Sequence, residues 1–123
     1  MFKRAANRQE LGGDIVKLPP RNLFQGMNKT EAKRAVELEA LKRDGAIRDW
    51  GFEAMTLKIG GDARYTPDFM VIENDGTLRF EETKGHWREA AKVRIKVAAE
   101  RFPCAFTALR LVKGQWEREE FGA

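Results

Sequence analysis

The turn sequence NDGT, Asn74 to Thr77, constrains the fold most strongly because it is typical of a tight turn between two β-strands. Strand-like runs flank it on both sides, from Tyr65 to Glu73 and from Thr77 to Lys84. A hairpin turning here pairs residues whose numbers add up to about 150 or 151. Asp68 is therefore predicted to lie opposite Glu82 or its immediate neighbour.

Charged residues in these apolar runs need a physical explanation. Strand side chains alternate with a period of two, so Glu82 and Lys84 share a face with Leu78 and Phe80. Two carboxylates side by side on a half-buried sheet repel each other, and Lys84 can pair with only one of them. A divalent cation such as Mg²⁺ or Mn²⁺, held by Asp68 and Glu82, would remove the conflict.

The segment before the hairpin predicts a helix that can supply a third acid. It is rich in helix formers, opens on the capping residue Asn28 and stops at Gly45. At about 100° per residue, Glu31 lies on the same stripe as Ala35 and Leu38 and should point inward. Two roles are open for Glu31: a site residue beside the carboxylates, or the second half of a capping box with Asn28.

The rest of the pattern predicts a strand from Trp50 to Ile59, a helix from Trp87 to Arg101 and a strand from Ala105 to Val112. The last helix lies between two strands, which implies that these strands are parallel. We predict a single α/β (α+β) domain over residues 28–123, with a central mixed sheet flanked by helices in the order αβββαβ. Residues 1–27 show no sustained period and predict an irregular basic arm.

Composition restricts the classes of partner. The formal net charge of +4 favours a polyanion such as nucleic acid. Cys104 is the single cysteine, so an intramolecular disulfide is excluded, and no apolar run approaches the roughly 20 residues of a membrane span. The N-terminal residues lack the apolar core of a secretory signal. We expect a cytoplasmic protein with no membrane partner.

Basic residues indicate where DNA would bind. Three of them recur every four residues and predict a basic ridge on the second helix: Arg88, Lys92 and Lys96. Apolar residues are predicted to cover the opposite side of that helix: Ala90, Val93, Val97 and Ala98. The arm contributes further candidates for phosphate contacts: Lys3, Arg4 and Arg8. His86, at the end of a strand, is a weaker site candidate.

The hairpin residues resemble the signature of the PD-(D/E)XK nucleases. Pro67-Asp68 is followed, after thirteen residues, by Glu82-Thr83-Lys84. The sequence is also similar to a family of small phage and prophage proteins of the endonuclease or Holliday-junction-resolvase-like kind. The matching residues are Glu31, YTPDF at 65–69, ETKG at 82–85 and VRIK at 93–96. Glu53 is a departure from the resemblance, because members of that family tend to have Gln there; two roles are open for it, an additional ligand of the site or a surface acid.

The resemblance implies a restriction-endonuclease-like core and a Mg²⁺-dependent DNA endonuclease acting on duplex, branched or junction DNA. It implies that Asp68, Glu82 and the Thr83 backbone carbonyl bind the metal, with Mn²⁺ able to substitute. Glu31 would serve a second metal or one of its water ligands. Lys84 would orient the attacking water, lower its pKa or stabilise the transition state.

The same resemblance places the protein in the cytoplasm of a bacterial or phage-infected cell, with a homodimer as one way to make paired cuts. The alternative function is a non-catalytic DNA-binding or packaging and recombination accessory protein that keeps a nuclease-like fold. A third class is a structural phage protein whose acids form a buried salt-bridge cluster. Substitution of Lys84 or Asp68 would then mainly damage folding.

Overall fold

A computed structural model of the chain describes residues 24–84 and 89–122. Helix α1 (Lys29–Arg43) begins directly after its cap, Asn28, and ends before Gly45, whose φ of 79° suits a glycine after a helix. Its inward residues, Ala35 and Leu38, are completely buried. The predicted helix and its apolar stripe are confirmed.

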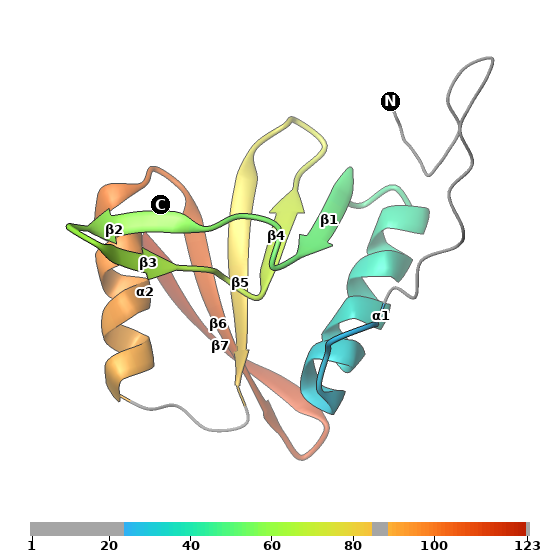
Figure 1. Cartoon of the computed structure of the whole chain (residues 1–123). Helices are drawn as coiled ribbons and strands as arrows, with labels where there is room; N and C mark the ends of the chain where they lie inside the picture. Colours follow the sequence, from blue (N-terminus) through green and yellow to red (C-terminus); the bar gives the residue numbers. More distant parts are fainter. Residues whose placement is uncertain (1–23, 85–88, 123) are drawn as a thin grey trace.

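Five strands form one mixed sheet in the order β1-β4-β5-β6-β7 (Figure 1). The β5–β6 pair is parallel, the other pairs are antiparallel, and helix α2 makes the crossover between β5 and β6. The predicted mixed sheet and its parallel pair are confirmed. The bounds are β1 Asp49–Phe52, β4 Phe69–Ile72, β5 Leu78–Lys84, α2 Glu89–Arg101, β6 Ala105–Val112 and β7 Gln115–Gly122.

The predicted strand from Trp50 to Ile59 is wrong as a single element. β1 ends at Phe52, and the next residue, Glu53, has a φ of 49°, which lies in the left-handed region that an extended strand does not use. The chain then forms β2 (Leu57–Gly60) and β3 (Ala63–Tyr65), which pair with each other in a separate two-stranded ribbon.

The predicted strand from Tyr65 to Glu73 is also divided. Tyr65 is the last residue of β3, and β4 begins only at Phe69. Pro67 lies between them, and proline has no N–H to donate to a strand ladder. The described elements therefore follow one another as α1, β1 to β5, α2, β6 and β7, instead of αβββαβ.

Strand β7 has no counterpart in the sequence prediction. It pairs with β6 over its full length and forms one edge of the sheet. Most of its side chains are exposed, and only Trp116 and Phe121 are partly buried. An edge strand that is polar on both faces lacks the alternating apolar pattern by which strands are recognised.

Each face of the sheet has its own apolar core, and α1 and α2 cover opposite faces (Figure 1). On one face Ala35 and Leu38 of α1 pack with Phe69 and Val71 of β4. On the other face, α2 and the β2–β3 ribbon cover β5 and β6. That second core contains Leu57, Ile59, Tyr65, Phe80, Ile95, Ala98, Phe106 and Ala108.

The prediction of the packed side of α2 is partly wrong. Val93 is 51% exposed and Ala90 is exposed, whereas Ile95 and Ala98 are buried. Val97 packs at the margin of the core. Apolar residues occur all around this helix, so their spacing alone does not select the side that meets the sheet.

Some predictions lie outside the described residues and stay predictions. These are most of the arm over residues 1–27, with Lys3, Arg4 and Arg8, and the two positions His86 and Arg88. Neither of the two described helices has the length and apolar character needed to cross a membrane.

Candidate active site

Asp68, directly before β4, lies beside Glu82 of the neighbouring strand β5. The β4–β5 register pairs Phe69 with Glu81, so the next position outward places Asp68 opposite Glu82. The Asp68 backbone N–H donates to Glu82 Oε1 at 3.2 Å. The two residues are only 6% and 8% exposed. The prediction that Asp68 lies opposite Glu82 is confirmed, although Asp68 stands just outside β4.

Thr83 fixes the orientation of the Asp68 carboxylate. Its backbone N–H and its hydroxyl both donate to Asp68 Oδ2, at 2.8 and 3.0 Å. Within the described parts of the chain, Asp68 Oδ1 receives no hydrogen bond. The N–H and C=O of one strand residue face the same neighbouring strand, so the Thr83 carbonyl lies on the edge of β5 nearest Asp68. Asp68 Oδ1, which has no described donor, and this carbonyl are therefore the two oxygens on this side that a cation could use.

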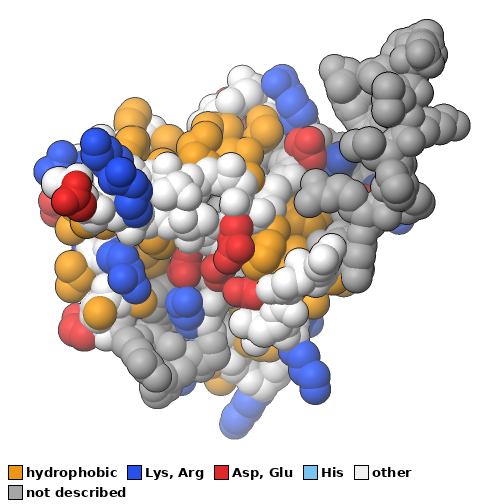
Figure 2. All heavy atoms as spheres, viewed as in Figure 1, with side chains coloured by type: hydrophobic (Ala, Val, Ile, Leu, Met, Phe, Trp, Pro, Cys, Tyr) orange, Lys and Arg blue, Asp and Glu red, His pale blue; other side chains and the backbone are white. Residues whose placement is uncertain are grey.

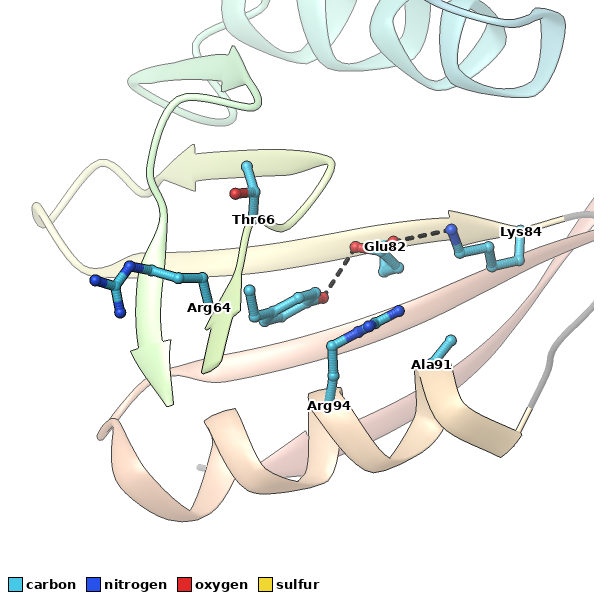
Figure 3. A pocket seen from close by; sticks show the side chains of 7 residues that line it. Arg64, Thr66, Glu82, Lys84, Ala91 and Arg94 are labelled. Atoms are coloured by element: carbon cyan, nitrogen blue, oxygen red, sulfur yellow. Dashed lines mark hydrogen bonds and ion pairs between the residues drawn. The ribbon is translucent and has the colours of Figure 1, made fainter. Parts of the chain in front are cut away.

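Both oxygens of Glu82 have partners. The Tyr65 hydroxyl donates to Oε1 at 2.9 Å, and Lys84 Nζ lies 3.1 Å from Oε2 (Figure 3). Tyr65 ends β3, so the β2–β3 ribbon supports a carboxylate of the main sheet. Lys84 lies on the same face of β5 as Glu82, as predicted from the alternation of strand side chains.

The Asp68 carboxyl has a raised pKa of about 7. Burial is the largest cause, because it disfavours the charged form, and repulsion from Glu82 adds to it. The hydrogen bond from the Thr83 backbone and the charge of Lys84 act in the opposite direction without cancelling these effects. The carboxylate pair thus carries more negative charge than its surroundings compensate.

Lys84 is a cation beside two acids. Burial by itself lowers the pKa of Lys84, but the attraction of Glu82, Asp68 and Glu31 outweighs burial and the net shift is upward. Lys84 therefore stays protonated at neutral pH.

Figure 2 shows acidic side chains gathered near the middle of the face between the two helices, with basic side chains around them.

Glu31 forms the capping box. Its backbone N–H donates to Asn28 Oδ1 at 2.8 Å, and the Asn28 backbone N–H donates to Glu31 Oε1 at 2.9 Å. The capping role left open by the sequence is therefore observed. The charge of Glu31 nevertheless raises the pKa values of both Asp68 and Lys84, which places its carboxylate near the site. The site role predicted for Glu31 is compatible with the cap and stays a prediction.

The described residues contain no preformed metal cluster. No three side chains of the His, Cys, Asp and Glu types come together there in an arrangement that could hold a metal ion. The donors that do meet, Asp68 and Glu82, are hard oxygen ligands with excess negative charge, which suits a small divalent cation.

Glu53 lies next to Asp68 through the backbone. Its N–H donates to the Asp68 carbonyl at 2.8 Å, while its side chain is exposed. Its positive φ of 49° is uncommon for a residue with a long side chain. The structure thus places Glu53 beside the site, and a role for its carboxylate stays a prediction.

The predicted basic ridge on α2 is only partly free. Lys92 Nζ lies 3.6 Å from Glu119 Oε1 of β7, so this lysine is directed toward an acid of the protein. Lys96 is exposed. The third member, Arg88, lies outside the described residues.

Sequence reasoning missed a surface pocket of about 220 Å³ beside Glu82 (Figure 3). Its wall includes Tyr65 and Thr66 from the ribbon end, Glu82 and Lys84 from β5, and residues of α2. The full lining is Arg64, Tyr65, Thr66, Glu82, Lys84, Ala91 and Arg94. Tyr65 and Arg94 lie within the segments YTPDF and VRIK, and the resemblance of these segments implies no role for either side chain.

A second missed group lies on the opposite face of β5. The buried Glu81 receives hydrogen bonds from Arg34 Nε at 2.7 Å and Arg34 Nη2 at 2.8 Å, and a further one from Arg79. Burial alone would raise the pKa of Glu81, but the bonds from Arg34 and Arg79 outweigh it and lower the pKa. This network attaches α1 to the strand that carries Glu82 and Lys84.

The chain matches no protein-family model, and comparisons with curated proteins and with solved structures found no significant match. The chemistry of the site is therefore the basis for any functional conclusion.

Proposed function

We propose that the protein is a metal-dependent endonuclease that hydrolyses phosphodiester bonds in DNA. The observation that carries the proposal is the meeting of two buried carboxylates, Asp68 and Glu82, with the protonated Lys84 at the wall of a pocket. Burial raises the pKa of Asp68 to about 7 and repulsion from Glu82 adds to this shift; a divalent cation bound by both carboxylates would relieve the repulsion.

The strand arrangement supports the proposal. Leaving aside the β2–β3 ribbon and β7, the elements are α1, β1, β4, β5, α2 and β6, in a sheet of order β1-β4-β5-β6. If the ribbon and β7 are treated as additions to a common core, this subset would correspond to the order αβββαβ that the resemblance to the PD-(D/E)XK nucleases implies. Asp68 stands directly before β4, and Glu82 and Lys84 stand in the last three residues of β5.

The donor set fits one small cation. Asp68 Oδ1, the Glu82 carboxylate and the Thr83 carbonyl would hold it. Mg²⁺ binds through one or two protein carboxylates and keeps several waters, so a third protein carboxylate is not required. Bound there, Mg²⁺ or Mn²⁺ would supply Lewis-acid stabilisation of the charge that develops on the phosphate.

The protein's own residues then have separable tasks. Thr83 keeps Asp68 in one orientation, and Tyr65 does the same for Glu82. The Lys84 ammonium has three N–H donors and Glu82 as its described partner, so it has donors left for a phosphate oxygen or for the attacking water. Glu31, at the N-terminus of α1, adds negative charge beside the pair.

The test is cleavage of labelled linear duplex, single-stranded, flap and four-way-junction DNA with Mg²⁺, Mn²⁺ or EDTA. Wild type should cut at least one of these DNAs in the presence of metal and none in EDTA. Lys84→Ala should abolish cutting and retain the fold by circular dichroism. Lys113→Ala, which removes an exposed lysine at the β6–β7 turn, is the matched control and should cut normally. Equal cutting by Lys84→Ala and wild type would disprove the assignment.

The alternative is a non-catalytic DNA-binding accessory protein, and the Lys84–Glu82 ion pair favours it. In that case the pair would serve to neutralise a buried acid. DNA binding without cutting under every metal condition would support this alternative.

A further inference from the structure

Arg94 of α2 extends into the pocket beside Tyr65 and Lys84 (Figure 3). Its side chain is close enough to the Tyr65 hydroxyl for its charge to act on that group. Within the described ranges, the Arg94 side chain forms no ion pair and no hydrogen bond. It does not pair with Glu82, although both line the same pocket; the described partners of the two Glu82 oxygens include Tyr65 and Lys84.

The charges of the pocket favour an anionic ligand. The lining contains three cationic side chains, Arg64, Lys84 and Arg94, and one acid, Glu82, which gives a net charge of 3 − 1 = +2. Ala91, in the first turn of α2, contributes a small side chain and the positive end of the helix dipole. A guanidinium with free N–H donors matches the geometry of a phosphate group, which it can bind with two parallel hydrogen bonds.

We propose that Arg94 binds a backbone phosphate of the DNA strand next to the phosphate that is cleaved, with the pocket between β3 and α2 as its subsite. The inference rests on the proposed function. Arg94 is not one of the residues of the predicted basic ridge, which are Arg88, Lys92 and Lys96. The pocket shares Glu82 and Lys84 with the carboxylate site, so a phosphate on Arg94 and a phosphate at the carboxylates can belong to one strand.

Arg64 is a weaker candidate for the same contact. It lines the other wall, but its guanidinium is directed away from Glu82 and Lys84 (Figure 3). Lys92 is weaker too, because it faces Glu119. Arg94 is therefore the cation of α2 that the described structure leaves unpaired at the wall of the site.

The first experiment measures binding of a fluorescein-labelled DNA duplex by anisotropy in EDTA, where metal-dependent cleavage is absent. Arg94→Gln should weaken binding about five- to tenfold and lower the slope of log K against log salt by about 1, since one phosphate contact is lost. Arg43→Gln is the matched control, because Arg43 is an exposed arginine in the last turn of α1. It should bind within about twofold of wild type. Arg94→Lys should recover part of the affinity, because it keeps the charge and loses the two-bond geometry.

The second experiment replaces single phosphates of the duplex by neutral methylphosphonates. One position near the cut should weaken binding by wild type and leave binding by Arg94→Gln unchanged, which identifies the phosphate that Arg94 contacts. Equal sensitivity of both proteins at every position would overturn the subsite, while continued cleavage by wild type would leave the proposed function intact. Failure of wild type to bind any DNA would overturn both. If inorganic phosphate binds through Arg94 and DNA binding is insensitive to Arg94→Gln, the pocket takes a free anion and the proposal is wrong.

Discussion

Thr83 donates its backbone N–H and its side-chain hydroxyl to the same oxygen of Asp68, Oδ2. The two bonds hold the Asp68 carboxylate in one plane and leave Oδ1 unbound among the described residues. The Asp68 carboxylate is therefore well oriented, but its negative charge is only partly compensated. The hydrogen bonds favour its ionised form, whereas burial and the charge of Glu82 oppose it. A carboxylate in this state is both held in one orientation and a source of instability.

Asp68→Asn should make the protein more stable at neutral and alkaline pH in EDTA. The pKa of Asp68 is 3.8 ordinarily and about 7 in the folded protein, so between these values the folded state binds more protons than the unfolded state. The free energy of unfolding of wild type therefore falls as the pH rises from about 4 to about 7, by at most about 4 kcal/mol. The amide that replaces the carboxyl group cannot ionise, so the advantage of this variant should grow over the same range and vanish below about pH 4.

Urea unfolding from pH 4 to pH 8 measures this difference. Asp75→Asn, which changes an exposed aspartate in the β4–β5 turn, is the matched control and should show no such gain. If the free energies of unfolding of wild type and Asp68→Asn depend on pH in the same way, Asp68 does not have a raised pKa in the folded protein.

Mg²⁺ should stabilise wild type through the same two carboxylates. A ligand that binds only the folded state at about ten times its dissociation constant adds about 1.4 kcal/mol to the free energy of unfolding. The melting temperature at pH 7.5 should rise with Mg²⁺ or Mn²⁺ in wild type and Asp75→Asn, and stay constant in Asp68→Asn and Glu82→Gln. An equal rise in all four proteins would place the metal elsewhere.

Tyr65→Phe should lower cleavage about tenfold with little loss of stability. The change removes the hydroxyl that orients Glu82 and keeps the buried ring, so the cost in unfolding free energy should be about 1 kcal/mol. Thr107→Val is a suitable control because it removes another hydroxyl bond to a carboxylate, that of Glu120, from a different part of the sheet. Loss of cleavage in Thr107→Val to the same extent would mean that the effect of Tyr65→Phe is general destabilisation.

Arg34→Met should destabilise the protein by about 3 kcal/mol, because it leaves the buried Glu81 with only Arg79. The double variant Arg34→Met/Glu81→Leu should recover most of this loss, since no buried charge then lacks its partner. Arg43→Met, which breaks an exposed pair with Glu39, should change stability by less than about 0.5 kcal/mol. Urea unfolding compares the four proteins, and a double variant as unstable as the single one would contradict the explanation.

The sequence was informative where the determining interactions are local. The turn at Asn74 to Thr77 fixes the β4–β5 register, and the period of strand side chains then places Asp68, Glu82 and Lys84 on one face. The capping box of Glu31 was visible for the same reason, because its partner is three residues away. These inferences needed no knowledge of the rest of the fold.

The sequence was less informative where contacts between distant segments determine the structure. Arg34 and Glu81 are far apart in sequence, and their neighbours give no sign that they will meet in the core. The turn of the chain at Glu53 is likewise set by where the β2–β3 ribbon packs, against α2 and β5, rather than by a glycine or proline at that position. The pocket with Arg94 joins three separate elements, so it could be found only after they were placed together.

The adjacent residues Glu81 and Glu82 are chemically identical but face opposite sides of β5. A slip of β5 by one residue would exchange them, and the acids alone would not oppose it. The neighbouring residues do oppose such a slip, because it would turn Phe80 toward the Arg34 side and take Lys84 away from the carboxylate pair. The fidelity of strand pairing during folding thus depends on the residues around the two glutamates, and the same residues determine which glutamate belongs to the site.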